Sequence, residues 1–221
     1  MEKLIAKLRK QNTPVTLNRA IRSKEVSSKI LHYFATDCAE RALLRERVLE
    51  REPLPVLWQG IEEKRLWVEN AFEKKQLIAT RKKIETAAKK LRSKWNGRGW
   101  WEYQQDTPEE AVWLTASAVY SSTTTSAKNT TSVLRAGNET RRVAEISAGV
   151  QVADQSLAQR EKIRSEARQA DCAWQCRRLA WWLETSLLTE RLWLTYSENC
   201  PFPPPDDIAI DFALLFPGAQ P

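Results

Sequence analysis

Two cysteines at helical spacing are the first residues to consider for chemistry. Cys172 and Cys176 lie four residues apart in a helical pattern, so both thiolates could reach one metal ion. A tetrahedral zinc site needs two more ligands, and His32, the only histidine, could supply them together with Cys38. The alternative is that these cysteines are small buried apolar side chains in a reducing compartment. We favour this alternative and predict no metal and no cofactor.

Catalytic motifs are absent from the sequence. It contains no glycine-rich phosphate loop, no Gly-x-Ser-x-Gly segment and no His-Glu-x-x-His segment. Acid–base chemistry would then depend on His32, on a lysine or on a pair of carboxylates. The pairs Glu62-Glu63 and Glu109-Glu110 are adjacent in sequence, and adjacent residues of a helix do not face each other. We therefore predict that the protein is not an enzyme, and keep an enzyme of unrecognised type as a third hypothesis.

Ten tryptophans are unusual for a chain of 221 residues. Trp100 and Trp101 follow a predicted loop, while Trp181 and Trp182 are neighbours in a predicted helix and should not be equally buried. Tryptophan is enriched at binding hot spots because it offers a large area and one hydrogen-bond donor. These four residues are candidate anchors for a partner protein, and beside arginines they could stack nucleobases. The alternative is a core in which bulky aromatic side chains fill gaps beside helices of small residues.

Positive charge is concentrated in the first part of the chain. Residues 1–94 contain 23 Lys and Arg against 12 Asp and Glu, whereas residues 95–197 contain 12 of each kind. One predicted helix carries much of this charge, in the candidate binding residues Arg81, Lys82, Lys83, Lys89 and Lys90 and in Arg92 and Lys94 beyond them. Such a face attracts an acidic protein surface or the phosphates of a nucleic acid. The alternative is an ordinary solvated helix face.

Apolar residues that recur every three to four positions predict the helices that position these side chains. Predicted helical stretches are a short N-terminal segment and residues 24–51, 57–95, 108–132 with a break between 121 and 131, 139–150 and 152–196. Gly137-Asn138 is predicted as a further break. Thr107-Pro108-Glu109-Glu110 predicts a helix start, with Thr107 as the cap, Pro108 in the first helical position and Glu110 completing a capping box.

These elements predict an all-α fold, a mostly antiparallel multi-helix bundle of six to eight helices. Six glycines are few for a fold with many turns, which favours long helices joined by few connections. We expect residues 1–197 to form a single helical domain. Residues 198–221 are rich in proline, and we expect them to form an extended C-terminal tail.

Two expectations concern the compartment. No run of 18 apolar residues occurs, so we predict no transmembrane span and no membrane partner. The N-terminus carries scattered charges and lacks the continuous apolar region of a signal peptide. We expect a cytoplasmic protein.

Two short segments carry a family resemblance. Residues 34–43 read Phe-Ala-Thr-Asp-Cys-Ala-Glu-Arg-Ala-Leu, and residues 170–179 read Ala-Asp-Cys-Ala-Trp-Gln-Cys-Arg-Arg-Leu. The first resembles the early helix, with an Asp-Cys-Ala-Glu-x-x-Leu pattern, of a bacterial family of helical immunity proteins from polymorphic toxin systems. The second resembles that family's closing helix, with Trp-Gln followed by a leucine. The resemblance spans about residues 30–190 and implies a bacterial, non-enzymatic helical protein that binds another protein.

The first functional hypothesis is therefore a protein-binding module, an inhibitor, immunity or accessory regulatory protein of a bacterial toxin or defence system, whose partner has an acidic surface. The second hypothesis is a basic accessory protein that binds nucleic acid, with residues 81–94 contacting phosphates. Neither hypothesis assigns a catalytic residue.

Overall fold

Eight α-helices and no strand make up the described part of the chain. The structure, a computed structural model, describes residues 1–96, 106–126 and 130–188. In chain order the helices are α1 (Glu2–Lys10), α2 (Pro14–Ile21), α3 (Ser28–Val48), α4 (Pro55–Val68), α5 (Lys74–Asn96), α6 (Pro108–Ser122), α7 (Thr130–Gln151) and α8 (Leu157–Leu188). The predicted all-α fold of six to eight helices is confirmed for these residues. The predicted tail, residues 198–221, lies outside them.

Short polar side chains fix where three of the helices begin. The hydroxyl oxygens of Thr13, Ser27 and Thr107 each accept a hydrogen bond from the backbone N–H three residues later, at 3.2, 3.3 and 3.2 Å. The predicted helix start at Thr107 is confirmed. Glu110 does not complete a capping box, because its carboxylate accepts a hydrogen bond from Arg142 of α7 at 2.8 Å instead. A charged donor from another helix thus replaces the local partner.

The predicted helix 57–95 is in fact two helices, α4 and α5. α4 ends where Asn70 adopts a φ of 59°, which allows the N–H of Ala71 to donate to the carbonyl of Leu66 at 2.8 Å. α3 ends in the same way at Glu50, with a φ of 58°. Such endings usually use glycine. Neither site has one, so the sequence lacks the usual signal for the end of a helix.

The connection between α6 and α7 falls inside the predicted break, because α6 ends at Ser122 and α7 begins at Thr130. The predicted break at Gly137-Asn138 is wrong, since α7 continues through both residues. A Cβ atom at position 137 would lie 3.1 Å from Oε1 of Gln175 on α8. Glycine at this position lets α7 and α8 pack closely rather than ending a helix.

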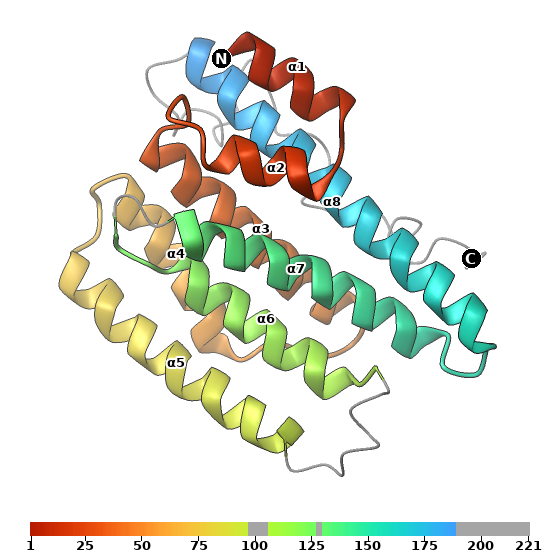
Figure 1. Cartoon of the computed structure of the whole chain (residues 1–221). Coiled ribbons are helices and arrows are strands. Elements are labelled where there is room, and N and C mark those ends of the chain that lie inside the picture. Colours follow the sequence, from red (N-terminus) through yellow and green to blue (C-terminus); the bar gives the residue numbers. More distant parts are fainter. Residues whose placement is uncertain (97–105, 127–129, 189–221) are drawn as a thin grey trace.

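Neighbouring helices run mostly antiparallel around α3 (Figure 1). α3 contacts α4, α6, α7 and α8, whereas α5 packs mainly on α4 and α6 at the lower edge of the view. α1 lies at the opposite edge, beside the C-terminal half of α8. Side-chain pairs show the antiparallel sense directly: Asp37 of α3 pairs with Arg178 of α8, while Arg45 pairs with Asp171.

The core consists of bulky side chains beside helices rich in small residues. Trp174 and Trp182 of α8 are the largest side chains with less than 2 % exposure, and they cluster with Tyr33 and Phe34 of α3. A second cluster includes Leu57, Ile84 and Val119 and joins α3, α4, α5 and α6. The interpretation of tryptophan as a core residue is therefore confirmed for Trp174 and Trp182. Within the described ranges, no helix has both the length and the apolar character needed to cross a lipid bilayer.

Candidate binding site

The basic residues predicted from the sequence lie on α5. Arg81 is half-buried, and its guanidinium lies 4.1 Å from the ring centre of Tyr120 while Nε donates to the Tyr120 carbonyl at 3.4 Å. Arg81 therefore ties α5 to α6 and is not a free surface cation. The four predicted lysines are exposed: Lys82, Lys83, Lys89 and Lys90.

The exposed lysines of α5 form two rows. Seven residues make almost two full helical turns, so residues seven apart lie in one row, about 10.5 Å apart along the axis. Lys75, Lys82 and Lys89 form the first row, and Lys83 and Lys90 form the second. Small exposed side chains lie between the rows, at Ala79, Thr86 and Ser93. We call the five lysines the α5 lysine face.

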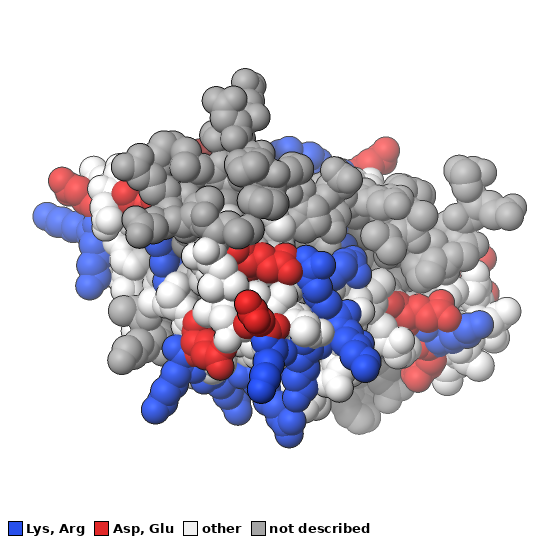
Figure 2. Space-filling model, turned by 90° about the horizontal axis from the view of Figure 1, so that it is seen from above, with Lys and Arg blue, Asp and Glu red and all other residues white. Residues whose placement is uncertain are grey.

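Few acidic groups neutralise the α5 lysine face. The helix contains nine Lys and Arg residues and a single acidic residue, Glu85. Its carboxylate lies 2.7 Å from Nζ of Lys89, and this hydrogen bond and the charge of the partner lower the pKa of Glu85 and raise that of Lys89. By contrast, the face that carries α1 shows acidic side chains among the basic ones (Figure 2). Positive charge is therefore concentrated on α5.

Packing on α4 and α6 fixes the orientation of the α5 lysine face. Leu77 and Ile84 are fully buried on the opposite side of the helix. Near its C-terminal end, Trp95 stacks on Trp113 of α6 with ring centres 5.1 Å apart. A Cβ atom on Gly60 of α4 would lie 2.5 Å from Cδ1 of Ile84, so glycine allows α4 to approach α5. These contacts leave the lysine rows directed toward solvent.

Two of the four predicted tryptophan anchors belong to the core. Trp182 has no exposed surface and Trp181 is 8 % exposed, so the expectation that they would differ in burial is wrong. The Trp182 ring stacks on Tyr33 with centres 4.5 Å apart, and Trp181 lies over the guanidinium of Arg178 at 4.4 Å. Contacts with α1 and α3 surround this end of α8, so neighbouring positions are both covered. The other two anchors, Trp100 and Trp101, lie outside the described residues.

Behind the surface, a layer of buried charged groups connects α3 and α8. Asp37 accepts hydrogen bonds from Nε of Arg178 and from Nε1 of Trp182, both at 2.7 Å. Burial alone would raise the pKa of Asp37, but Arg178 and then Arg65 more than offset it, and the pKa is lowered. The aspartate is therefore ionised at neutral pH.

The same arrangement occurs in reverse at Asp171. Its Oδ1 accepts from Nε of Arg41 at 3.0 Å and from Nη2 of Arg45 at 3.1 Å. Burial would raise the pKa of Asp171, yet the two arginines lower it. The buried aspartate of each helix therefore accepts hydrogen bonds from side chains of the other helix. Both aspartates belong to the Asp-Cys-Ala segments noted in the sequence, but their exchange of partners was not predicted.

Two buried bases lie between α3, α4 and α6. Burial, and next the charge of Lys64, lower the pKa of His32 to about 3, and its ring packs edge-on against Trp67 at 5.2 Å. Burial and then Arg81 lower the pKa of Lys64 to about 7. The ammonium donates to the Thr124 carbonyl just beyond the end of α6, where the helix dipole favours a cation. Lys64 therefore ties α4 to the segment that follows α6.

Three of the four cysteines, Cys38, Cys172 and Cys176, lie within the described residues. Across the part of the chain that the structure describes, no three His, Cys, Asp or Glu side chains are placed to hold a metal ion. Cys38, Cys172 and Cys176 are buried and not in disulfides. A hydrogen bond between the latter two lowers the pKa of Cys172 and, with burial, raises that of Cys176. These thiols pack as core side chains.

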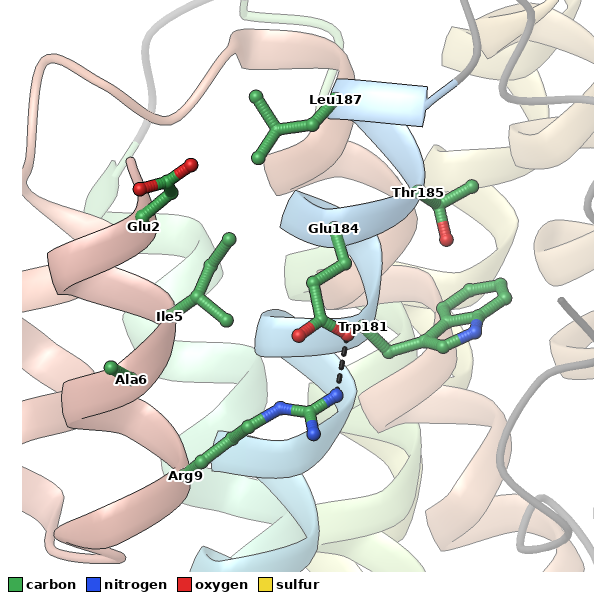
Figure 3. Close-up of a pocket in the computed structure, with 8 residues that line it drawn as sticks. All are labelled: Glu2, Ile5, Ala6, Arg9, Trp181, Glu184, Thr185 and Leu187. Atoms are coloured by element: carbon green, nitrogen blue, oxygen red, sulfur yellow. Dashed lines mark hydrogen bonds and ion pairs between the residues drawn. The ribbon is translucent and has the colours of Figure 1, made fainter.

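A mostly apolar groove runs between α1 and the C-terminal part of α8 (Figure 3). Ile5 of α1 points into the space toward α8, and Leu187 lies at its upper end. The lower end is closed by an ion pair between Arg9 and Glu184, at 2.5 Å. Glu2 also lines the groove, so its charged residues are two carboxylates and one guanidinium.

Comparisons with known protein families, with curated proteins and with solved structures give no match.

Proposed function

We propose that this chain is a non-enzymatic binding protein that contacts an acidic surface of a partner protein through the α5 lysine face. The observation that carries the proposal is the concentration of five exposed lysines in two rows with one acidic residue on the helix. The positive electrostatic potential of these lysines raises the rate of encounter with an anionic surface and disfavours encounter with basic surfaces. The rigid packing of α5 on α4 and α6 holds the rows in a fixed arrangement, which reduces the entropy lost on binding.

The nature of the partner follows from the family resemblance. We propose that it is a toxin or another component of a bacterial defence system, and that this chain inhibits or assists it. The two resembling segments, 34–43 and 170–179, support this because they pack together: Arg41 and Asp171 are 130 residues apart and form a buried ion pair. The two segments that carry the resemblance therefore lie side by side in the same helical bundle.

Nucleic acid is the second candidate partner, and the composition of the α5 lysine face favours it. Protein interfaces are depleted in lysine and rely on apolar anchors. On the described part of α5, Ile78 is the large apolar side chain that is exposed, at 38 %. Phosphates need no such anchor. Lysines bind them as point charges, and this binding releases the counterions that surround the nucleic acid.

A pull-down with matched variants separates these candidates. The α5 variant carries Lys82→Gln, Lys83→Gln, Lys89→Gln and Lys90→Gln, which keep helix propensity and remove four charges. The control variant removes the same charge elsewhere, through Lys3→Gln, Lys7→Gln, Lys10→Gln and Lys24→Gln, all exposed. Each tagged protein captures partners from a lysate of the native host, with and without nuclease.

The proposal expects one stoichiometric protein that survives nuclease and is retained by the control variant. Capture by the α5 variant should fall about tenfold, since each rim charge changes affinity modestly. Loss of all captured material on nuclease treatment would replace the protein partner with nucleic acid. Equal capture by all three proteins would rule out the α5 lysine face as the binding site.

A further inference from the structure

A second basic feature lies away from α5, in a pocket between α2 and α7. Its volume is about 380 Å³, and its lining residues are Asn18, Arg22, Leu134, Arg135, Asn138 and Arg141. Three arginines and two asparagines are thus directed to one space, and no carboxylate is among the lining residues. This volume falls within the range of small-molecule sites.

Arg141 forms the buried part of this pocket, with 4 % exposure. Nη1 donates to Oε1 of Gln175 at 2.5 Å, and Nη2 donates to Oδ1 of Asn138 at 3.4 Å. Nε is buried and has no hydrogen-bond partner among the described residues. Both acceptors are neutral amides, so no carboxylate of the described structure is bonded to this buried cation. A buried charge without a counter-charge is costly unless another group neutralises it.

The nearest part of the buried polar layer cannot supply that counter-charge. Gln175 donates its amide to Oδ2 of Asp171 at 2.9 Å and to the carbonyl of Gly137 at 2.8 Å, which leaves Oε1 to accept from Arg141. Asp171 itself is already bonded to Arg41 and Arg45. Gln175 therefore holds the Arg141 guanidinium in place without cancelling its charge.

The two remaining arginines add to the positive potential. Arg22 is exposed at the end of α2, and no side-chain partner for it occurs within the described ranges. Arg135 is 58 % exposed at its side chain, and it donates Nε to Glu139 at 2.9 Å and Nη2 to Ser117 of α6 at 3.4 Å. Three positive charges and one negative charge leave two positive charges at the pocket, which matches a dianion.

We propose that this pocket binds a small phosphorylated molecule, with its phosphate held by Arg22, Arg135 and Arg141. A guanidinium presents N–H donors in a fork that fits phosphate oxygens, and a phosphate monoester carries nearly two negative charges at pH 7. Asn18 and Asn138 can bond hydroxyl groups, and Leu134 gives an apolar wall for the rest of the molecule. This site is independent of the α5 lysine face and of any protein partner.

Isothermal titration of the purified chain tests the site, with inorganic phosphate, glucose 6-phosphate and acetate as probes at constant ionic strength. We expect saturable binding of one equivalent of both phosphates, tighter for glucose 6-phosphate, and much weaker binding of acetate. The variants Arg22→Gln and Arg135→Gln should each weaken phosphate binding about tenfold or more, because each removes a charged hydrogen bond. Both residues are exposed, so these variants should fold.

Arg19→Gln is the matched control, because Arg19 is exposed on the same helix and does not line the pocket. It should bind phosphate like the unmodified chain. Absence of saturable phosphate binding would overturn the proposal, as would equal weakening by Arg19→Gln, which would indicate general charge attraction. Acetate binding as tight as phosphate binding would overturn the assignment of a dianion. None of these results depends on the pull-down described above.

Discussion

Asp37 and Asp171 show how single residues hold this bundle together. Each is fully buried and accepts hydrogen bonds from arginines of the other helix, so α3 and α8 are joined at two points by charge-assisted hydrogen bonds. Such pairs contribute little net stability compared with apolar packing, but removal of one partner leaves the others buried and uncompensated. Their geometry also fixes the register of the two helices, because sliding either one would separate both aspartates from their arginines.

Asp37→Asn should destabilise the fold by about 3 to 5 kcal/mol, because Arg178 would keep its charge in a buried site without a counter-charge. Urea unfolding followed by circular dichroism measures the change. Glu52→Gln is the control, since Glu52 pairs with Arg47 at the surface, with side-chain exposures of 64 % and 52 %. That control should leave the unfolding curve almost unchanged, because exposed ion pairs contribute little to stability. A loss below 1 kcal/mol for Asp37→Asn would contradict a structural role for the layer.

His32 makes the stability depend on pH. The folded chain holds its pKa at about 3, below the usual 6.5, so protonation favours the unfolded chain. The contribution is fully present above pH 6.5 and is lost as the pH falls toward 3. We expect a loss of about 1 to 3 kcal/mol between pH 6.5 and 4.5 that His32→Phe abolishes, since phenylalanine keeps the contact with Trp67. Equal acid sensitivity of both proteins in urea titrations would refute this assignment.

At the scale of elements, helix ends in this chain depend on backbone conformations that the residue types do not favour. Glu50 and Asn70 both lie in the left-handed region. Asparagine tolerates that region better than glutamate because its short side chain can hydrogen-bond locally. The α3 end is therefore the more strained of the two.

Glu50→Gly should stabilise the fold by about 1 kcal/mol, because glycine adopts the left-handed conformation without the Cβ penalty. Glu50 is exposed, so little packing is lost. Asn70→Gly should give a smaller gain. Thermal unfolding of the two variants and of the parent chain measures both changes in stability. A lower unfolding midpoint for Glu50→Gly would show that the backbone at Glu50 is not strained.

Local signals in the sequence were enough to predict the helical class and the start of α6. Thr107 and Pro108 act within one turn, so their effect does not depend on the rest of the fold. Other features depend on residues far along the chain. Gly137 permits close packing against Gln175, and Trp181 is covered because helices surround that end of α8. The arginine partners of Asp37 and Asp171 could not be identified from spacing alone for the same reason.

At the scale of the whole molecule, exposed basic residues are unevenly distributed over the helical bundle. The α5 lysine face lies on a helix at the edge of the bundle formed by the described helices (Figure 1). The arginine pocket between α2 and α7 is a separate, smaller basic site suited to a small molecule. The two proposals assign an acidic protein surface to the α5 lysine face and a small phosphorylated molecule to this pocket.

Lysine footprinting of the chain, alone and in complex with the protein it captures, tests the central claim most directly. Acetylation by a small reagent, read by mass spectrometry, reports the access of each lysine. The account predicts that Lys82, Lys83 and Lys90 lose most of their reactivity in the complex, while Lys3 and Lys7 on α1 keep theirs. Unchanged reactivity of the α5 lysines, together with protection of another face, would contradict the claim that α5 is the binding surface.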